Sequence, residues 1–164
     1  MRASNFSLLL TSVLLPHLTP TDSKPILGVD LGSLYMKVAL VQRNAPLEII
    51  VNMHSKRKTE QMILFDSGTR FYGSDASSLI ARKPTFTPYS MNLLLGRDED
   101  HPVIVGQTER HSPLPAHYNS TRSGVCLTVS STPYTPEELV AMILSHAKDI
   151  TTAHGVTTQI NDCV

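Results

Sequence analysis

The sequence predicts an α/β fold, because paired apolar runs near its start precede a long amphipathic helix near its end. The two runs, Ile26–Leu31 and Tyr35–Val41, flank a Gly32-Ser33 corner. Short apolar runs separated by glycine and a small polar residue are typical of a β-hairpin. The predicted helix starts at Thr135, because Thr135, Pro136 and Glu138 are residue types typical of a capped helix N-terminus and have the required spacing.

The hairpin also carries residues that suit phosphate chemistry. The second run alternates as a strand does, with Met36, Val38 and Leu40 on one face and Tyr35, Lys37, Ala39 and Val41 on the other. A glycine turn lets backbone N–H groups approach an anion, and Asp30, just before the turn, is an oxygen ligand suited to Mg²⁺ or its bound water. The same local pattern also fits a hairpin with a purely structural role.

Composition indicates a single globular domain without a dominant charge. The chain has 164 residues, of which 41% are hydrophobic and 17% are charged. Fourteen basic residues balance fourteen acidic ones, so no overall field favours nucleic acid or an anionic membrane as a partner. Cys126 and Cys163 are too few for a disulfide framework, and we expect two free thiols.

Residues 1–23 predict a secretory signal peptide. Arg2 supplies a positive start, and the apolar stretch Phe6–Leu15, ended by Pro16, has the length of a signal h-region rather than of a membrane span. The alternatives are an apolar N-terminal helix of the domain or a mitochondrial presequence, against which the single arginine counts. The mature product is expected to be lumenal or secreted, with no further membrane segment.

The next segment predicts a third strand and a second hairpin. Leu47–Val51 is a nearly solid apolar run, typical of an inner strand. The basic stretch Ser55–Thr59 could lie over nucleotide phosphates, contact a partner, or form a solvated loop. Asp66-Ser67-Gly68 supplies turn residues between strands at Gln61–Phe65 and Thr69–Tyr72. Ser74 is expected to cap a short helix that ends near Arg82.

The stretch from Thr85 to Ser123 predicts little regular structure. Ser90–Leu95 has helical spacing ended by Gly96, and a polar, proline-rich segment follows. His101, His111 and His117 match no metal-ligand spacing, so we expect no metal site there. Asn119-Ser120-Thr121 is an N-glycosylation sequon in an expected surface loop, usable if the signal peptide operates.

The chain continues with a strand and its clearest helix. Gly124–Ser130 has strand-forming residues, and Thr135, Pro136 and Glu138 predict a capping box. Gly155 is the expected C-terminal stop. One apolar stripe, typical of core packing, comprises Leu139, Met142, Ile143, Ala147 and Ile150. His146 and His154 are expected to be ordinary boundary residues.

Several of these stretches resemble the heat shock protein 70 family. Gly28-Val-Asp-Leu-Gly-Ser33 followed by a strand resembles its first phosphate-binding hairpin, and Asp30–Ala39 is most similar to the large endoplasmic-reticulum branch (the glucose-regulated protein 170, or hypoxia up-regulated, type). The resemblance covers roughly Pro25 to Val164. Further matching stretches, in order, are Leu47–Asn52, Ser55–Thr59, Arg70–Gly73, Asn92–Arg97 and Tyr134–Leu144.

This resemblance implies an actin-like ATPase (ribonuclease H-like) fold, with residues 25–164 forming part of lobe I of a nucleotide-binding domain. It implies ATP or ADP with Mg²⁺ as cofactors and places Asp30 near the water shell of the metal. The residues that match the first phosphate loop are Gly32, Ser33, Leu34 and Tyr35. Leu34 stands where conventional members have a second threonine, and Glu60 replaces a proline common after Arg57-Lys58-Thr59.

Catalytic residues are not assigned by the resemblance. The catalytic lysine of conventional members aligns with Asn92, which supplies no cation for a transferring phosphoryl group. The large branch also lacks that lysine. ATP hydrolysis is therefore expected to be weak or absent, and to occur only in an intact protein of which this chain is a truncated piece.

By resemblance, the intact protein is a chaperone of the endoplasmic reticulum lumen that assists folding under stress. Its implied partners are unfolded client proteins and the conventional lumenal heat shock protein 70 chaperone, with which it would act or for which it would serve as nucleotide exchange factor. One alternative is an inactive truncated remnant without nucleotide binding. Another is a different actin-like ATPase such as a sugar kinase, against which the helix at Thr135 and the segment Ser55–Thr59 argue.

Overall fold

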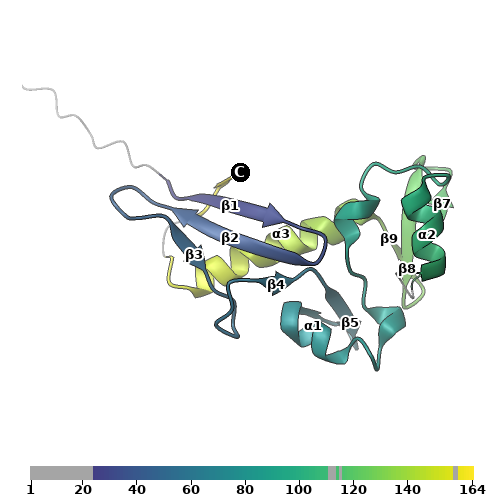
Figure 1. The fold of residues 1–164 in the computed structure, drawn as a ribbon, viewed down its shortest axis with the longest axis horizontal. Coiled ribbons are helices and arrows are strands. Elements are labelled where there is room, and N and C mark those ends of the chain that lie inside the picture. The colour runs from purple at the N-terminus through teal and green to yellow at the C-terminus, as the bar shows by residue number, and fades with distance from the viewer. Residues whose placement is uncertain (1–23, 111–113, 115, 157–158) are drawn as a thin grey trace, which may run out of the picture.

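The structure is a computed structural model that describes residues 24–110, 114, 116–156 and 159–164. A main sheet lies against the long helix α3, while a smaller sheet with α2 lies near the start of that helix (Figure 1). The predicted signal peptide at residues 1–23 falls outside the described residues. Within the described part of the chain, no helix combines the length and apolar character that crossing a membrane requires.

Ten strands, three α-helices and two 3-10 helices make up the described part of the chain. In chain order they are β1 (Ile26–Leu31), β2 (Tyr35–Val41), β3 (Glu48–Ile50), β4 (Thr59–Glu60), β5 (Ile63–Asp66), β6 (Thr69–Tyr72), α1 (Gly73–Leu79), η1 (Pro84–Phe86), η2 (Met91–Leu94), α2 (Pro102–Arg110), β7 (Ala116–Asn119), β8 (Gly124–Val129), β9 (Thr132–Tyr134), α3 (Pro136–Ala153) and β10 (Asp162–Cys163).

The predicted first hairpin is confirmed at both strands. β1 and β2 pair antiparallel from Ile26 opposite Val41 to Leu31 opposite Met36. Met36, Val38 and Leu40, which the alternation places on one face, are buried, with at most 3% of each residue exposed. Their side chains join the core that α3 also lines. Burial of this face fixes the register, because a one-residue slip would expose all three side chains.

The main sheet has the order β10-β1-β2-β3, and β4 pairs with the turn end of β2. β10 runs parallel to β1, so the segment at Asp162 completes the second edge of β1. The predicted inner position of Leu47–Val51 is wrong, because β3 lies at the edge of this order. Ile50 faces the core, but Ile49 is 41% exposed on the opposite face.

The long helix confirms the predicted capping box and packs its stripe on the sheet. The Thr135 hydroxyl accepts the Glu138 N–H at 3.1 Å, and the Glu138 carboxylate accepts the Thr135 N–H at 2.8 Å. The helix ends at its C-cap His154, and Gly155 follows at φ +100°. Its buried apolar side chains include Leu139, Ile143, Ala147 and Ile150.

The second hairpin is confirmed, whereas the predicted cap of α1 is wrong. β5 and β6 pair around Ser67 and Gly68, which both adopt positive φ. The N-cap of α1 is Tyr72, without a side-chain cap bond, and the Ser74 hydroxyl instead donates to Glu60 at 2.9 Å. Ser74 lies within the first turn of α1, two residues after the N-cap position.

The segment from Thr85 to Ser123 is more regular than its sequence predicts. The expected helical turn at Ser90–Leu95 is the 3-10 helix η2, and α2 follows as a helix that the sequence did not predict. β7, β8 and β9 form a separate antiparallel sheet. The strand expected at Gly124–Ser130 is β8. Cys126 on β8 is buried and Cys163 on β10 is exposed, and both are free thiols as expected.

Candidate functional site

The turn between β1 and β2 is the candidate site that the sequence singles out. The Gly32 N–H donates to the Tyr35 carbonyl at 3.0 Å and closes the turn around Ser33 and Leu34. Neither of those two residues donates its own backbone N–H to the described part of the chain. Leu34 is 61% exposed and Tyr35 is 43% exposed. The turn therefore offers two adjacent amide donors to an external acceptor.

A glycine is needed at position 32 because the Tyr35 carbonyl oxygen approaches its backbone closely, not because its φ is positive. A Cβ at this position would lie 3.0 Å from the Tyr35 carbonyl oxygen. That oxygen is the acceptor of the closing hydrogen bond, so a side chain would push against the atom that holds the turn together. The sequence expectation that a glycine shapes this corner is consistent with this geometry.

Three residues from two segments support the turn from behind through its carbonyl groups. The Ser90 hydroxyl donates to the Ser33 carbonyl at 2.8 Å, and the Gln61 N–H donates to the Leu34 carbonyl at 2.9 Å. The Asn92 side-chain amide donates to the Leu31 carbonyl at 3.3 Å. Because the carbonyl groups are occupied by the protein, the amide groups are left as the free polar groups of the turn.

Asp30 is held in an ion pair across the hairpin. Its carboxylate lies 2.6 Å from the Lys37 ammonium, and the two residues are direct partners in the β1–β2 register. The Asp30 and Lys37 side chains are 63% and 50% exposed. This pairing could have been predicted from the sequence, because Asp30 and Lys37 lie at equal distances from the turn of the hairpin. A metal-bound water near Asp30 would share the carboxylate with Lys37.

Asn92 lies behind the turn and provides only neutral polar groups. Its amide nitrogen is used on the Leu31 carbonyl, while its buried Oδ1 has no hydrogen-bond partner among the described residues. Gln61, which is 1% exposed, likewise has both side-chain polar atoms unpartnered there. At this position Asn92 and Gln61 thus provide neutral amide groups.

The basic segment Ser55–Thr59 lies beside the same turn. β4 pairs with the start of β2, with Glu60 opposite Tyr35 and Thr59 opposite Met36. The Lys58 ammonium lies 5.7 Å from the centroid of the Tyr35 ring. From the sequence alone, this segment could contact phosphates, contact a partner or form a solvated loop. The sequence analysis did not predict the contact between Lys58 and Tyr35. The sequence feature that could have indicated it is the run of basic residues.

The remaining predicted positions lie away from the turn. Asn119 ends β7, and its side-chain oxygen accepts the Thr121 N–H at 3.0 Å. Asn119 and Thr121 thus sit together in the β7–β8 connection. Among the described residues no three metal-ligating side chains gather, and His111 lies outside those residues.

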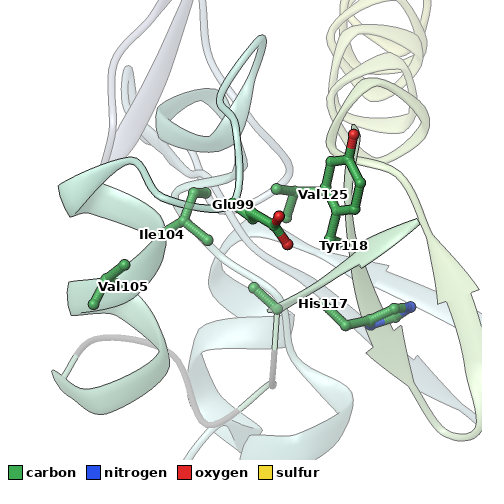
Figure 2. A pocket seen from close by; sticks show the side chains of 7 residues that line it. Glu99, Ile104, Val105, His117, Tyr118 and Val125 are labelled. Atoms are coloured by element: carbon green, nitrogen blue, oxygen red, sulfur yellow. The ribbon is translucent and has the colours of Figure 1, made fainter. Parts of the chain in front are cut away.

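A separate pocket of about 340 Å³ lies between α2 and the β7–β8 pair. Figure 2 shows the Glu99 carboxylate between Ile104 and Val125 in this pocket, with His117 and Tyr118 farther along its wall. The lining combines aliphatic side chains with one carboxylate, one imidazole and one phenol. The residues of the β1–β2 turn do not line it.

Comparison with known proteins gives a consistent family match. The family model described as Hsp70 protein matches residues 26–164. Hypoxia up-regulated protein 1 of Homo sapiens is 32% identical over 143 residues, which is 86% of this chain and 14% of that protein. Hypoxia up-regulated protein 1 of Danio rerio is 32% identical over 132 residues, which is 79% of this chain and 13% of that protein.

The matched region is a small part of each relative. The Xenopus laevis protein of the same name is 31% identical over 131 residues, corresponding to 79% of this chain and 20% of that protein. The chain therefore spans between about one eighth and one fifth of the length of these curated relatives.

Proposed function

The chain belongs to the Hsp70 family, and we propose that its β1–β2 turn binds the phosphates of ATP or ADP as part of a nucleotide-binding domain. The family membership places the described strands and helices in a portion of the Hsp70 nucleotide-binding domain, an actin-like ATPase fold. Membership of this family also excludes a sugar kinase, which was compatible with the first hairpin alone.

The observation that carries the proposal is the pair of free amides at the turn. Ser33 and Leu34 present adjacent backbone N–H groups, while the surrounding protein occupies the carbonyl groups of Leu31, Ser33 and Leu34. Backbone N–H groups in a tight turn form a favourable environment for phosphate oxygens. The Ser33 hydroxyl adds a further donor type at the same corner. A phosphate at these N–H groups would not compete with the hydrogen bonds that support the turn, because those bonds are made to its carbonyl groups.

Asp30 is the residue we propose for the Mg²⁺ that accompanies the nucleotide. Its carboxylate would act through a metal-bound water, and Lys37 at 2.6 Å fixes the direction of that carboxylate. When bound, Mg²⁺ would neutralise phosphate charge and orient the phosphate oxygens. Asn92 provides no cation at its position, so we expect ATP turnover to be slow or absent.

We further propose that the protein acts as a chaperone in the endoplasmic reticulum lumen. The relatives are named hypoxia up-regulated protein 1, which suggests a role in the stress response. In this proposal, it assists client folding and acts with the conventional lumenal Hsp70 chaperone or promotes its nucleotide exchange. Residues 1–23 serve as the signal peptide, and Asn119 carries an N-linked glycan.

Calorimetric titration of the purified protein with MgATP, MgADP and adenosine tests the nucleotide proposal. Binding of both magnesium nucleotides, with adenosine bound at least about tenfold more weakly, is the expected result. A nucleotide-free protein is the second candidate, because Lys37 already pairs with Asp30 and Asn92 supplies no charge. Absence of heat and of amide shifts at Ser33 and Leu34 with millimolar MgATP would establish that second candidate instead.

A further inference from the structure

We propose that Lys58 is the cation that meets the nucleotide phosphates at the β1–β2 turn. The inference rests on the proposed nucleotide binding and assigns a charged partner to the same turn. The turn itself supplies only neutral amide and hydroxyl donors, and Asn92 behind it is also neutral. A polyphosphate carries several negative charges, and beside any bound Mg²⁺ the neutral donors of the turn supply no counter-charge from the protein.

Lys58 is placed beside the turn by strand pairing. It immediately precedes β4, which pairs with the first residues of β2 through Tyr35 opposite Glu60 (Figure 1). The Lys58 ammonium lies 5.7 Å from the Tyr35 ring centroid. Tyr35 is also the residue whose carbonyl closes the turn. The cation is therefore held against the residue that borders the free amides.

Lys58 is also the lysine near this turn whose charge is not matched by a carboxylate. Lys37 pairs with Asp30 at 2.6 Å, and Lys56 lies 3.9 Å from Glu60. No Asp or Glu of the described chain lies within ion-pair distance of Lys58. The ring of Tyr35 attracts an ammonium group without neutralising it. The Lys58 ammonium thus has no carboxylate partner among the described residues and can be directed to an incoming anion.

A fixed loop holds the backbone of Lys58 in position. Asn52, which is 8% exposed, donates its side-chain amide to the Lys58 carbonyl at 3.3 Å and to the Thr59 hydroxyl at 3.2 Å. The Asn52 side-chain oxygen accepts the N–H groups of His54 and Lys56, each at 3.0 Å. One buried amide therefore organises both ends of the basic loop. This makes Asn52 a positioning residue for Lys58.

Lysine suits this role because its ammonium group is a compact charge on a flexible stem. In the free protein the Tyr35 ring provides a resting position for it. A phosphate at the turn would offer the ammonium charge-assisted hydrogen bonds, which are stronger than its contact with the ring. No bond to carbon or phosphorus changes in this step, which is a transfer of the ammonium group between two non-covalent partners.

The test compares Lys58→Met with Arg57→Met in the purified protein. Both variants remove one positive charge from adjacent exposed residues, but no hydrogen bond, ion pair or ring contact joins Arg57 to the turn among the described residues. The probes are MgATP, inorganic tripolyphosphate and adenosine. Lys58→Met is expected to bind MgATP and tripolyphosphate about tenfold more weakly. Arg57→Met is expected to change either affinity by less than about twofold, and adenosine affinity is expected to change in neither variant.

Two further measurements separate a local role from a general loss of fold. Lys58→Arg is expected to retain MgATP affinity within about threefold, and Asn52→Ala is expected to weaken it in the same direction as Lys58→Met. In the unchanged protein, the Lys58 ε-methylene protons are expected to lose their Tyr35 ring-current shift when tripolyphosphate is added. These proton shifts report on the lysine directly, whatever the stability of the variants.

The outcomes distinguish the two proposals. If the unchanged protein binds MgATP but Lys58→Met binds it equally well, Lys58 has no role and the nucleotide proposal stands. Equal losses in the Lys58 and Arg57 variants would also overturn the inference, because they would indicate a diffuse field. If the unchanged protein binds neither MgATP nor tripolyphosphate, the nucleotide proposal fails and the role of Lys58 fails with it.

Discussion

The Tyr72 ring and the His146 imidazole stack face to face, with centroids 4.5 Å apart and planes 9° from parallel. This contact joins the end of β6 to the middle of α3. Burial lowers the pKa of His146 below its ordinary value of 6.5, while the nearby carboxylates Asp149 and Asp75 oppose that change. The neutral imidazole is therefore the form that the folded protein favours.

Stability is expected to fall with acidification because of His146. A folded-state pKa below the unfolded value means that the unfolded chain binds the proton more readily. The contribution is fully present above pH 6.5 and is lost as the pH falls through the folded pKa. Urea unfolding between about pH 5 and about pH 8 measures this slope. His146→Phe keeps an aromatic ring and should reduce the slope, and an unchanged slope would remove His146 as its source.

Gly73→Ala is expected to destabilise the protein by about 1–2 kcal/mol. Gly73 has φ +57°, and a Cβ there would lie 2.7 Å from the Cγ2 atom of the buried Thr59. Gly106→Ala in α2 is the matched control, because its Cβ would enter open space. That control should leave stability unchanged or raise it by up to about 1 kcal/mol. Denaturant midpoints compare the two, and equal effects would contradict this account.

Thr135→Ala is expected to cost about 1 kcal/mol of stability, because it removes the side-chain acceptor of the Glu138 N–H. Thr135→Ser keeps the hydroxyl and should retain most of the stability. A double-mutant cycle with Glu138→Ala should show coupling, since the two residues exchange both bonds of the capping box. Strict additivity in chemical unfolding would indicate that the two bonds act independently.

Gly32→Ala is expected to weaken MgATP binding by about tenfold, because its Cβ would displace the Tyr35 carbonyl and disturb the turn amides. Gly28→Ala in β1, the strand before the turn, is the control, since its nearest atoms would be at an ordinary 3.7 Å. Calorimetric titration gives both affinities. Equal affinities in the two variants would show that the close approach at Gly32 has no bearing on binding.

Expression through a secretory pathway is expected to add a glycan at Asn119. Asn119→Gln and Thr121→Ala should both abolish an endoglycosidase-sensitive mobility shift, since the sequon needs the amide and the hydroxyl. Thr121→Ser keeps the hydroxyl and should retain the shift. A protein that enters the lumen and runs at one mobility with or without endoglycosidase would contradict glycosylation.

The sequence predicted elements whose signals are local. The first hairpin and α3 were correctly bounded, because alternating burial and a capping box are both encoded within a few residues. α2 was missed because its Val103-Ile104-Val105 run and Gly106 have poor helix propensity. Its apolar residue Ile104 joins the common core. Tertiary packing therefore decides its structure.

The strands β9 and β3 show the same limit. β9 was not predicted; it contains Pro133 and lies at the edge of its sheet, where a proline is tolerated. The apolar composition of Leu47–Val51 suggested burial on both sides, although only Ile50 reaches the core within β3. Strand order is set by distant pairing partners, which a run of apolar residues does not encode.

In the candidate site, the sequence identified the turn but not its surroundings. Gly32 and Asp30 were recognisable from residue type and spacing. The supports at Gln61, Ser90 and Asn92 reach the turn only because separate segments fold beneath it. The position of Lys58 over Tyr35 likewise depends on the pairing of β4 with β2.

The parallel pairing of β10 with β1 has a consequence for the order of folding. Val29 donates its N–H to the Val164 carbonyl, and Val164 donates to the Leu27 carbonyl. Strand β1 thus shares hydrogen bonds with residues that lie far later in the sequence. The hairpin and α3 can form from nearby contacts, but this edge of the sheet must wait for a long loop to close. Until then β1 exposes an unpaired edge, and a nascent chain would be most open to association at that stage.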